Sequence, residues 1–264
     1  MYTACNRAKW IAHTALLLAV AMGLALQGGW AQSKGEIIVS AAASLKNAFE
    51  ELAPIYEKQT GVKPAFNFAA SGVLQQQIES GAPADVFASA AQKQMGDLQA
   101  RGLIDVATRK DFTGNSLVLI IPADSKLKIS AFADLARPEF ARIAIGNPKT
   151  VPAGQYAEES LKNLNLWDKL QPRFIMAENV RQVLDYVSRG EVDAGLVYSS
   201  DAAVAGNKIS IVSQAPKRTH QEIIYPVAVV KDSKNSDAAK KFVDLLLGDT
   251  GKKILAKYGF AIPQ

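Results

Sequence analysis

Short runs of apolar, largely β-branched residues alternate with segments of helical periodicity along the chain. Nine such runs are predicted as strands, at residues 36–40, 63–68, 86–88, 116–121, 142–146, 174–176, 194–198, 209–212 and 223–230. Strands that alternate with helices favour an α/β fold with mostly parallel sheets, because a helix is the usual connection between parallel strands. We therefore expect layered sheets with helices on their faces.

Helices are predicted where apolar residues recur every three or four positions. The clearest cases are Leu45, Ala48, Phe49, Leu52 and Tyr56, and Val180, Val183, Leu184 and Val187. Pro152 is typical of a first helical turn, where its missing N–H loses no partner, and predicts a helix through residues 154–163. Two more helices are expected near the end of the chain, at 237–247 and 250–258.

Residues 1–31 have the pattern of an export signal. Arg7 and Lys9 form a basic start, residues 15–26 are almost all apolar, and Gly29-Trp30-Ala31 has the small residues of a cleavage site. The alternative is a membrane anchor, but the apolar run is shorter than the roughly 20 residues that a span needs. We therefore expect export, with cleavage after Ala31.

The composition that remains after Ala31 excludes several classes of function. Cys5, the only cysteine, precedes the apolar core, which argues against a lipid-modified mature terminus and leaves no thiol or disulfide. Removal of Arg7 and Lys9 changes the 30 basic and 25 acidic residues to 28 and 25, a formal charge of +3. These charges form no basic stripe, so nucleic-acid binding is not expected.

No low-complexity linker, fixed repeat or charge block divides the mature sequence. Two lobes are still expected if the chain crosses between them near residues 113–116 and again before Ile223. Residues 32–113 and 223–264 would then form lobe I, and residues 114–222 would form an inserted lobe II. Long strands that span both lobes would act as hinges.

Four junctions between a predicted strand and a helix are candidate binding elements. They are Ala43-Ser44-Leu45, Ala70-Ser71-Gly72, Val151-Pro152-Ala153-Gly154 and Glu178-Asn179-Val180-Arg181. Helix N-termini carry unpaired N–H donors and partial positive charge, and they gather at the carboxyl ends of strands in open α/β sheets. Together they could hold a small anion. The alternative for Ser44 or Ser71 is an ordinary helix cap, whose hydroxyl serves its own backbone.

Three further polar side chains lie near these junctions. Tyr198 ends an apolar strand and precedes Ser199-Ser200-Asp201, so its hydroxyl could reach into a cleft, although packing at a sheet edge is the alternative. Lys46 and Arg181 could add positive potential, but we interpret them as solvated charges on helix faces and keep them outside the site.

Catalytic and metal-binding patterns are scarce in the mature sequence. Its one histidine, His220, lies in a polar stretch typical of a surface loop, whereas a serine hydrolase needs its base inside a shaped site. No Gly-x-Ser-x-Gly elbow, phosphate loop or dinucleotide fingerprint occurs, and no His or Cys pair has metal-ligand spacing. Asp85, Asp193 and Asp201 are separated acids without a visible partner. We therefore expect neither an enzyme nor a cofactor nor direct metal ligands.

Seven motifs occur in a fixed order along the mature chain. They are Ala41-Ala42-Ala43-Ser44-Leu45, Phe68-Ala69-Ala70-Ser71-Gly72, Gly81-Ala82-Pro83-Ala84-Asp85-Val86-Phe87, Gly114-Asn115-Ser116-Leu117-Val118, Val151-Pro152-Ala153-Gly154-x-Tyr156-Ala157, Gly195-Leu196-Val197-Tyr198-x-Ser200-Asp201-Ala202 and Tyr225-Pro226-Val227-Ala228-Val229-Val230. In this order they resemble the periplasmic molybdate-binding proteins of molybdate ABC transporters. The resemblance extends to Tyr258-Gly259-Phe260 and so covers essentially the whole mature chain.

The resemblance implies a two-lobed type II periplasmic binding-protein fold, each lobe a mostly parallel sheet flanked by helices, that closes on molybdate or tungstate. A monomeric periplasmic protein would deliver this oxyanion to an inner-membrane ABC permease. Carried over by position, the ligand-binding residues are Ser44 and Ser71 from lobe I and Ala153, Val180 and Tyr198 from lobe II. The serines would supply hydroxyl and backbone donors, the next two residues backbone N–H groups, and the tyrosine its phenol. Ala70 departs from relatives that carry a hydroxyl there, which could tune affinity.

Three alternatives remain open at this point. A sulfate- or thiosulfate-type receptor is possible because a neutral cage of donors suits any tetrahedral dianion and the cavity radius is invisible in sequence. A secreted hydrolase could use Ser44 or Ser71 as its nucleophile, which the shortage of histidine disfavours. An effector lobe of a transcription regulator shares this fold, but here an export signal stands where DNA-binding helices would be expected.

Overall fold

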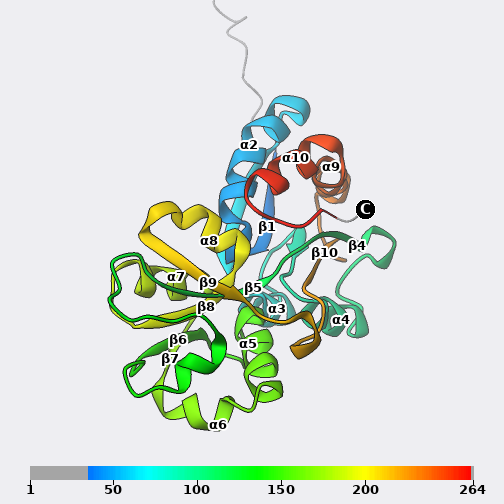
Figure 1. Ribbon diagram of the computed structural model, residues 1–264. Coiled ribbons are helices and arrows are strands. Elements are labelled where there is room, and N and C mark those ends of the chain that lie inside the picture. The colour runs from blue at the N-terminus through cyan, green and yellow to red at the C-terminus, as the bar shows by residue number, and fades with distance from the viewer. Residues whose placement is uncertain (1–34, 263–264) are drawn as a thin grey trace, which may run out of the picture. The chain divides into compact units, whose positions relative to one another are not determined.

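The computed structural model describes residues 35–262, so the predicted export signal at 1–31 and Cys5 lie outside the described residues. Within this range ten strands form two five-stranded sheets flanked by helices (Figure 1). The first sheet has the order β2-β1-β3-β10-β4, with β1 Glu36–Ala42, β2 Lys63–Ala69, β3 Val86–Ala88, β4 Lys110–Gly114 and β10 Ile224–Val229. Its helices are α2 Lys46–Thr60, α3 Ser71–Glu79, α4 Gln92–Ala100, α9 Ser236–Leu247 and α10 Asp249–Lys257. We call this part lobe I.

The second sheet has the order β7-β6-β8-β5-β9 and forms what we call lobe II. Its strands are β5 Leu117–Pro122, β6 Ile143–Gly146, β7 Phe174–Ala177, β8 Ala194–Tyr198 and β9 Ile209–Gln214. Its helices are α5 Pro152–Asn163, α6 Trp167–Leu170, α7 Val180–Ser188 and α8 Ser199–Ala205. None of the helices between residues 35 and 262 has the length and hydropathy needed to cross a bilayer.

The local patterns account for most of these elements. All nine predicted strands are present, and the predicted helices correspond to α2, α5, α7, α9 and α10. Strand β4 was not predicted, because an edge strand is paired on one side only and here buries just Phe112 and Thr113. Its sequence therefore lacks the apolar run on which the prediction depends.

Each sheet is mixed, so the expectation of mostly parallel sheets was too strong. Strand β1 pairs in parallel with β2 and β3, whereas β10 is antiparallel to β3 and β4. In the second sheet β6 is parallel to β7 and β8, whereas β5 is antiparallel to β8 and β9. The reason is topological: β5 and β10 are the strands that follow a passage of the chain from one sheet to the other.

The chain passes between the sheets at residues 115–116 and again within residues 215–223. Both passages lie outside the strands, so no single strand of the described residues spans both lobes, contrary to the expectation of strand hinges. The described residues cluster as one compact unit. The exact lobe boundaries, 32–113 with 223–264 and 114–222, therefore stay a prediction.

Candidate functional site

A small cavity lies between the two lobes and is lined by all five residues predicted to bind the ligand. Ser44 and Ser71 come from lobe I, and Ala153, Val180 and Tyr198 come from lobe II. The cavity volume is about 10 Å³, roughly the room that one water molecule needs. The rest of its wall consists of Ala42, Ala43, Ala69, Ala70, Ala90, Val151, Pro152 and Asn179. No charged side chain is among these described lining residues.

The sheet register brings the two serines to the same place. In the parallel pair of β1 and β2, Ala42 lies opposite Ala69 at the end of both strands. Ser44 and Ser71 each follow two residues later, Ser44 in the 3-10 helix η2 (Ala43–Leu45) and Ser71 as the first residue of α3. Since neighbouring parallel strands end at the same sheet edge, both serines reach the cavity from one side.

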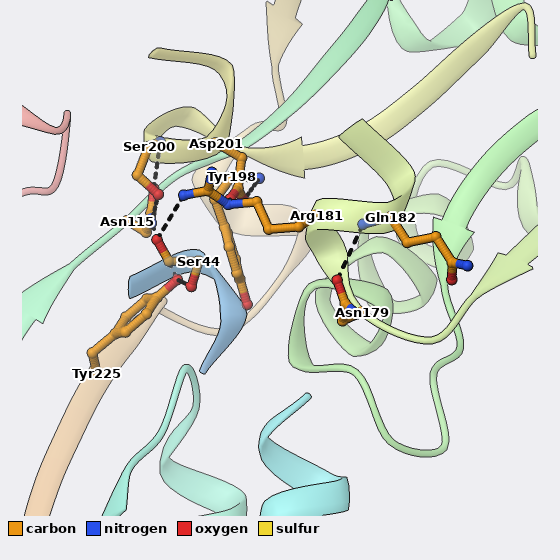
Figure 2. Close-up of polar contacts among 9 residues, drawn as sticks. All are labelled: Ser44, Asn115, Asn179, Arg181, Gln182, Tyr198, Ser200, Asp201 and Tyr225. Carbon is orange, nitrogen blue, oxygen red and sulfur yellow. Dashed lines mark hydrogen bonds and ion pairs between the residues drawn. The ribbon is translucent and has the colours of Figure 1, made fainter. Parts of the chain in front are cut away.

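Lobe II presents the first turns of α5 and α7. A Cβ on Gly154 would lie 2.0 Å from the carbonyl oxygen of Gly146, so only glycine lets α5 begin directly against β6. The α7 helix is capped by Asn179, whose Oδ1 accepts from the N–H of Gln182 at 3.1 Å (Figure 2). The N–H groups of Ala153 and Val180 lie in these first turns, where the helix offers no acceptor for them.

Neither serine caps its own helix. Ser71 Oγ accepts from the N–H of Ala90 at 3.0 Å, and Ser44 Oγ lies 3.0 Å from the hydroxyl of Tyr225. Both serines are buried, and neither η2 nor α3 receives a side-chain cap bond. The helix-cap alternative is therefore wrong for both residues.

Tyr198 has the only tyrosine hydroxyl among the lining residues, and it is 1% exposed. Its hydroxyl has no hydrogen-bond partner among residues 35–262, and burial raises the pKa of this phenol well above its usual value. The phenol therefore stays protonated and keeps its donor for whatever enters the cavity. Strand β8 is the central strand of its sheet, so the alternative of packing at a sheet edge is wrong.

Arg181 is not the solvated helix-face charge that we expected. Its Nε lies 2.6 Å from Oδ1 of the fully buried Asp201, and its Nη2 donates to the carbonyl of Ser44 at 3.0 Å (Figure 2). Burial raises the pKa of Asp201 to about 6, although the Arg181 guanidinium lowers it. The ion pair lies within lobe II beside the cavity and its charges cancel locally, whereas the bond from Arg181 to the Ser44 carbonyl connects the two lobes. Lys46, in contrast, is a half-exposed surface charge paired with Glu50.

Two polar residues behind Ser44 occur in the quoted motifs but were given no role from the sequence. Tyr225 in β10 and Asn115 between the lobes are joined by a hydrogen bond from Asn115 Nδ2 to the Tyr225 hydroxyl at 3.2 Å. Neither lines the cavity. The motifs that contain them do not reveal this role, because they approach Ser44 only through the tertiary fold.

The described residues offer neither a histidine base at the cavity nor a cluster of metal ligands. His220 is not among the cavity residues, and its Nδ1 lies 2.7 Å from the carbonyl of Gln221. Between residues 35 and 262, no group of three or more His, Cys, Asp or Glu side chains is placed to hold a metal ion.

Comparison with known proteins places this chain in a family. Residues 37–261 match the family described as bacterial extracellular solute-binding protein. The chain belongs to this family. It is 40% identical over 263 residues to the molybdate-binding protein ModA of Escherichia coli strain K12, covering 96% of this chain and 98% of that protein. It is also 40% identical over 250 residues to the putative ABC transporter substrate-binding lipoprotein YvgL of Bacillus subtilis strain 168, covering 94% and 95% of the two chains.

A solved structure of the periplasmic molybdate-binding protein of Azotobacter vinelandii has the same architecture. It aligns with a TM-score of 0.77 and 28% identity over 86% of this chain and 100% of that one. The two-lobed binding-protein fold expected from the sequence is thus confirmed for this solute-binding protein. The ligand roles of the five cavity residues stay a prediction.

Proposed function

We propose that this protein binds molybdate in the cavity between its lobes and delivers it to an ABC permease. The observation that carries the proposal is a buried site whose polar groups are neutral and can all donate hydrogen bonds. The chain's relatives include proteins named for molybdate binding, which supports molybdate as the oxyanion. Tungstate has the same charge and tetrahedral shape, and we expect it to bind as well.

The donors suffice for tight binding without a charged side chain. A hydrogen bond to a charged group contributes roughly 1.5–3 kcal/mol, and micromolar to nanomolar affinity needs about 8–12 kcal/mol. The donors are the hydroxyls of Ser44, Ser71 and Tyr198 and the N–H groups of Ala153 and Val180. Neutral donors leave the anion free to dissociate once the lobes separate.

Binding is expected to involve movement of the lobes. Lobe I and lobe II touch beside the cavity, where the N–H of Gly72 donates to the carbonyl of Thr150 at 2.9 Å. A tetrahedral oxyanion is larger than the water-sized cavity, so we expect the lobes to lie slightly further apart around the ligand. Entry and release would need a wider opening by hinge motion.

The remaining expectations form part of the same proposal. The protein acts as a monomeric periplasmic carrier, exported by residues 1–31, and not as an enzyme. It needs no cofactor, and molybdenum is held only as its oxyanion. The inner-membrane permease of the ABC transporter is its macromolecular partner.

A sulfate-type receptor is the second candidate, because the same donors suit any tetrahedral dianion. Isothermal titration of residues 32–264 with molybdate, tungstate, sulfate and phosphate separates the two. We expect tight binding of molybdate and tungstate and at least 100-fold weaker binding of sulfate. Sulfate that binds as tightly as molybdate would replace the proposed ligand, and covalent labelling of Ser44 or Ser71 by a serine-directed phosphonate would favour the hydrolase instead.

A further inference from the structure

The Ser44 hydroxyl can offer the cavity either its proton or a lone pair. A hydroxyl has one proton, so its direction depends on what its other neighbour supplies. That neighbour is the Tyr225 hydroxyl, 3.0 Å away, and both side chains are buried. The role of Ser44 toward a ligand is therefore decided by Tyr225.

Asn115 determines the direction of the hydrogen bonds at the Tyr225 hydroxyl. Its Oδ1 accepts from the backbone N–H of Ser116 at 2.9 Å and from the hydroxyl of Ser199 at 2.8 Å. Because a backbone N–H can only donate, this end of the amide is the oxygen, and the NH2 end faces Tyr225 and Ser200. Asn115 Nδ2 thus donates to the Tyr225 hydroxyl at 3.2 Å.

Of the two hydrogen bonds that the described residues make at the Tyr225 hydroxyl, only the one to Ser44 Oγ can take the phenol proton, because Asn115 Nδ2 is a donor. The phenol oxygen already accepts from Asn115, and burial raises its pKa well above the usual value, so the proton is retained. Pointing this proton at Ser44 Oγ satisfies it, whereas reversing the bond would leave a buried O–H unpaired at a cost of about 1–3 kcal/mol. The Ser44 proton is consequently directed away from Tyr225 and toward the cavity that Ser44 lines.

We propose that Asn115 and Tyr225 are positioning residues that hold the Ser44 hydroxyl as a donor and thereby select fully deprotonated oxyanions. The inference rests on the proposed function. An anion such as hydrogen phosphate must donate its own proton to the site, and a fixed donor at Ser44 offers it no acceptor. Molybdate, tungstate and sulfate carry no proton at neutral pH and suffer no such penalty.

A double-mutant cycle with Tyr225→Phe and Ser44→Ala tests this mechanism. Tyr225→Phe retains the buried ring and removes the hydroxyl that orients Ser44. We expect it to weaken molybdate binding about 3- to 10-fold, the equivalent of one neutral hydrogen bond. The ratio of molybdate to hydrogen phosphate affinity, measured by competition at pH 7.5, should fall as well. In the Ser44→Ala background the same change should have no further effect on either quantity.

Tyr156→Phe is the matched control, because Tyr156 is a buried tyrosine of the same aromatic cluster, 6.5 Å from the Tyr198 ring, and does not line the cavity. It should leave both affinities unchanged. Equal losses from Tyr225→Phe with and without Ser44 would show a merely structural role and overturn the proposal, as would an unchanged phosphate ratio.

Asn115→Asp provides a second, independent route to the same result. A carboxylate at this position cannot donate, so Tyr225 would turn its proton toward it and Ser44 would turn its lone pair toward the ligand. We expect a loss of molybdate affinity larger than that of Tyr225→Phe, and most of it should vanish when Ser44 is alanine. A loss that persists in Ser44→Ala would be a plain charge effect and count against the relay. If the wild type binds sulfate but not molybdate, the proposed function fails, while the cycle can still be measured with sulfate.

Discussion

The hydroxyl of Ser71 is oriented by the protein itself, independently of any ligand. Its Oγ accepts from the N–H of Ala90, so one lone pair is used and its proton is available to the cavity. The residue could be selected from sequence as the first polar group after a strand. That it is not a helix cap could not, because the donor that uses its oxygen comes from residue 90.

Ser71→Ala should weaken molybdate binding about 10- to 100-fold, since a hydrogen bond to a charged group is lost. The N–H of Ala90 also loses its acceptor, so the melting temperature should fall slightly. Ser89→Ala is the control, because Ser89 is equally buried and bonded to Ala91 but does not line the cavity. It should lower stability without changing affinity in calorimetric titration. Similar affinities for the two variants would remove Ser71 from the site.

The raised pKa of Asp201 predicts how the free energy of unfolding depends on pH. The folded protein raises the pKa of this carboxyl to about 6, whereas an aspartate in an unfolded chain titrates near about 3.9. The folded state therefore binds the Asp201 proton more tightly than the unfolded chain does. The stabilisation of the fold by this proton is complete below about pH 4 and is lost as pH rises through about 6. Relative to Asp201→Asn, the wild-type free energy of unfolding should fall by up to about 3 kcal/mol between pH 4 and 7. Urea denaturation of both proteins at several pH values measures this free energy. If it depends on pH in the same way in both proteins, the pKa of Asp201 is not raised in the folded state.

At the scale of elements, the first turn of α7 contributes a backbone donor that no side-chain substitution removes except proline. Val180 is the first residue of the helix, where proline is well tolerated. Asn179 before it has an extended backbone, with φ −157° and ψ 170°, which is also the conformation that precedes proline.

Val180→Pro should therefore fold and retain α7 while it loses molybdate affinity by at least about tenfold, because one charge-assisted hydrogen bond disappears. Val180→Ala keeps the N–H and serves as the control for lost packing. Circular dichroism reports the helix content and calorimetry the affinity. If the two variants bind equally well, the Val180 N–H is not a ligand donor.

At the scale of the whole molecule, Gly72 limits how closely the lobes approach. A Cβ at this position would lie 2.6 Å from the carbonyl oxygen of Thr150 and 2.9 Å from its Cα, both in the opposite lobe. The contact is between backbone atoms, so it cannot be relieved by a change of rotamer.

Gly72→Ala should hold the lobes further apart than a bound oxyanion requires and so reduce molybdate affinity at least about tenfold. The α3 helix should remain folded, because alanine in a helix is favoured over glycine by roughly 0.5–1 kcal/mol. Gly96→Ala in α4 is the matched control, since nothing lies within 4 Å of its added Cβ. Small-angle scattering with saturating molybdate should give a larger radius of gyration for Gly72→Ala than for Gly96→Ala. Equal radii and equal affinities would show that closure does not depend on this contact.

The sequence by itself determined the alternation of strands and helices, since both periods are local properties of the chain. It also identified Ser44, Ser71 and Tyr198 as polar residues at strand ends, and the family resemblance added Ala153 and Val180. Only the tertiary structure decided how these groups are oriented. The Arg181 pair with Asp201 and the bond between Ser44 and Tyr225 join residues on different elements, the latter 181 positions apart. Such contacts leave no periodic trace in sequence, because they arise only when elements distant in the chain pack together within each lobe.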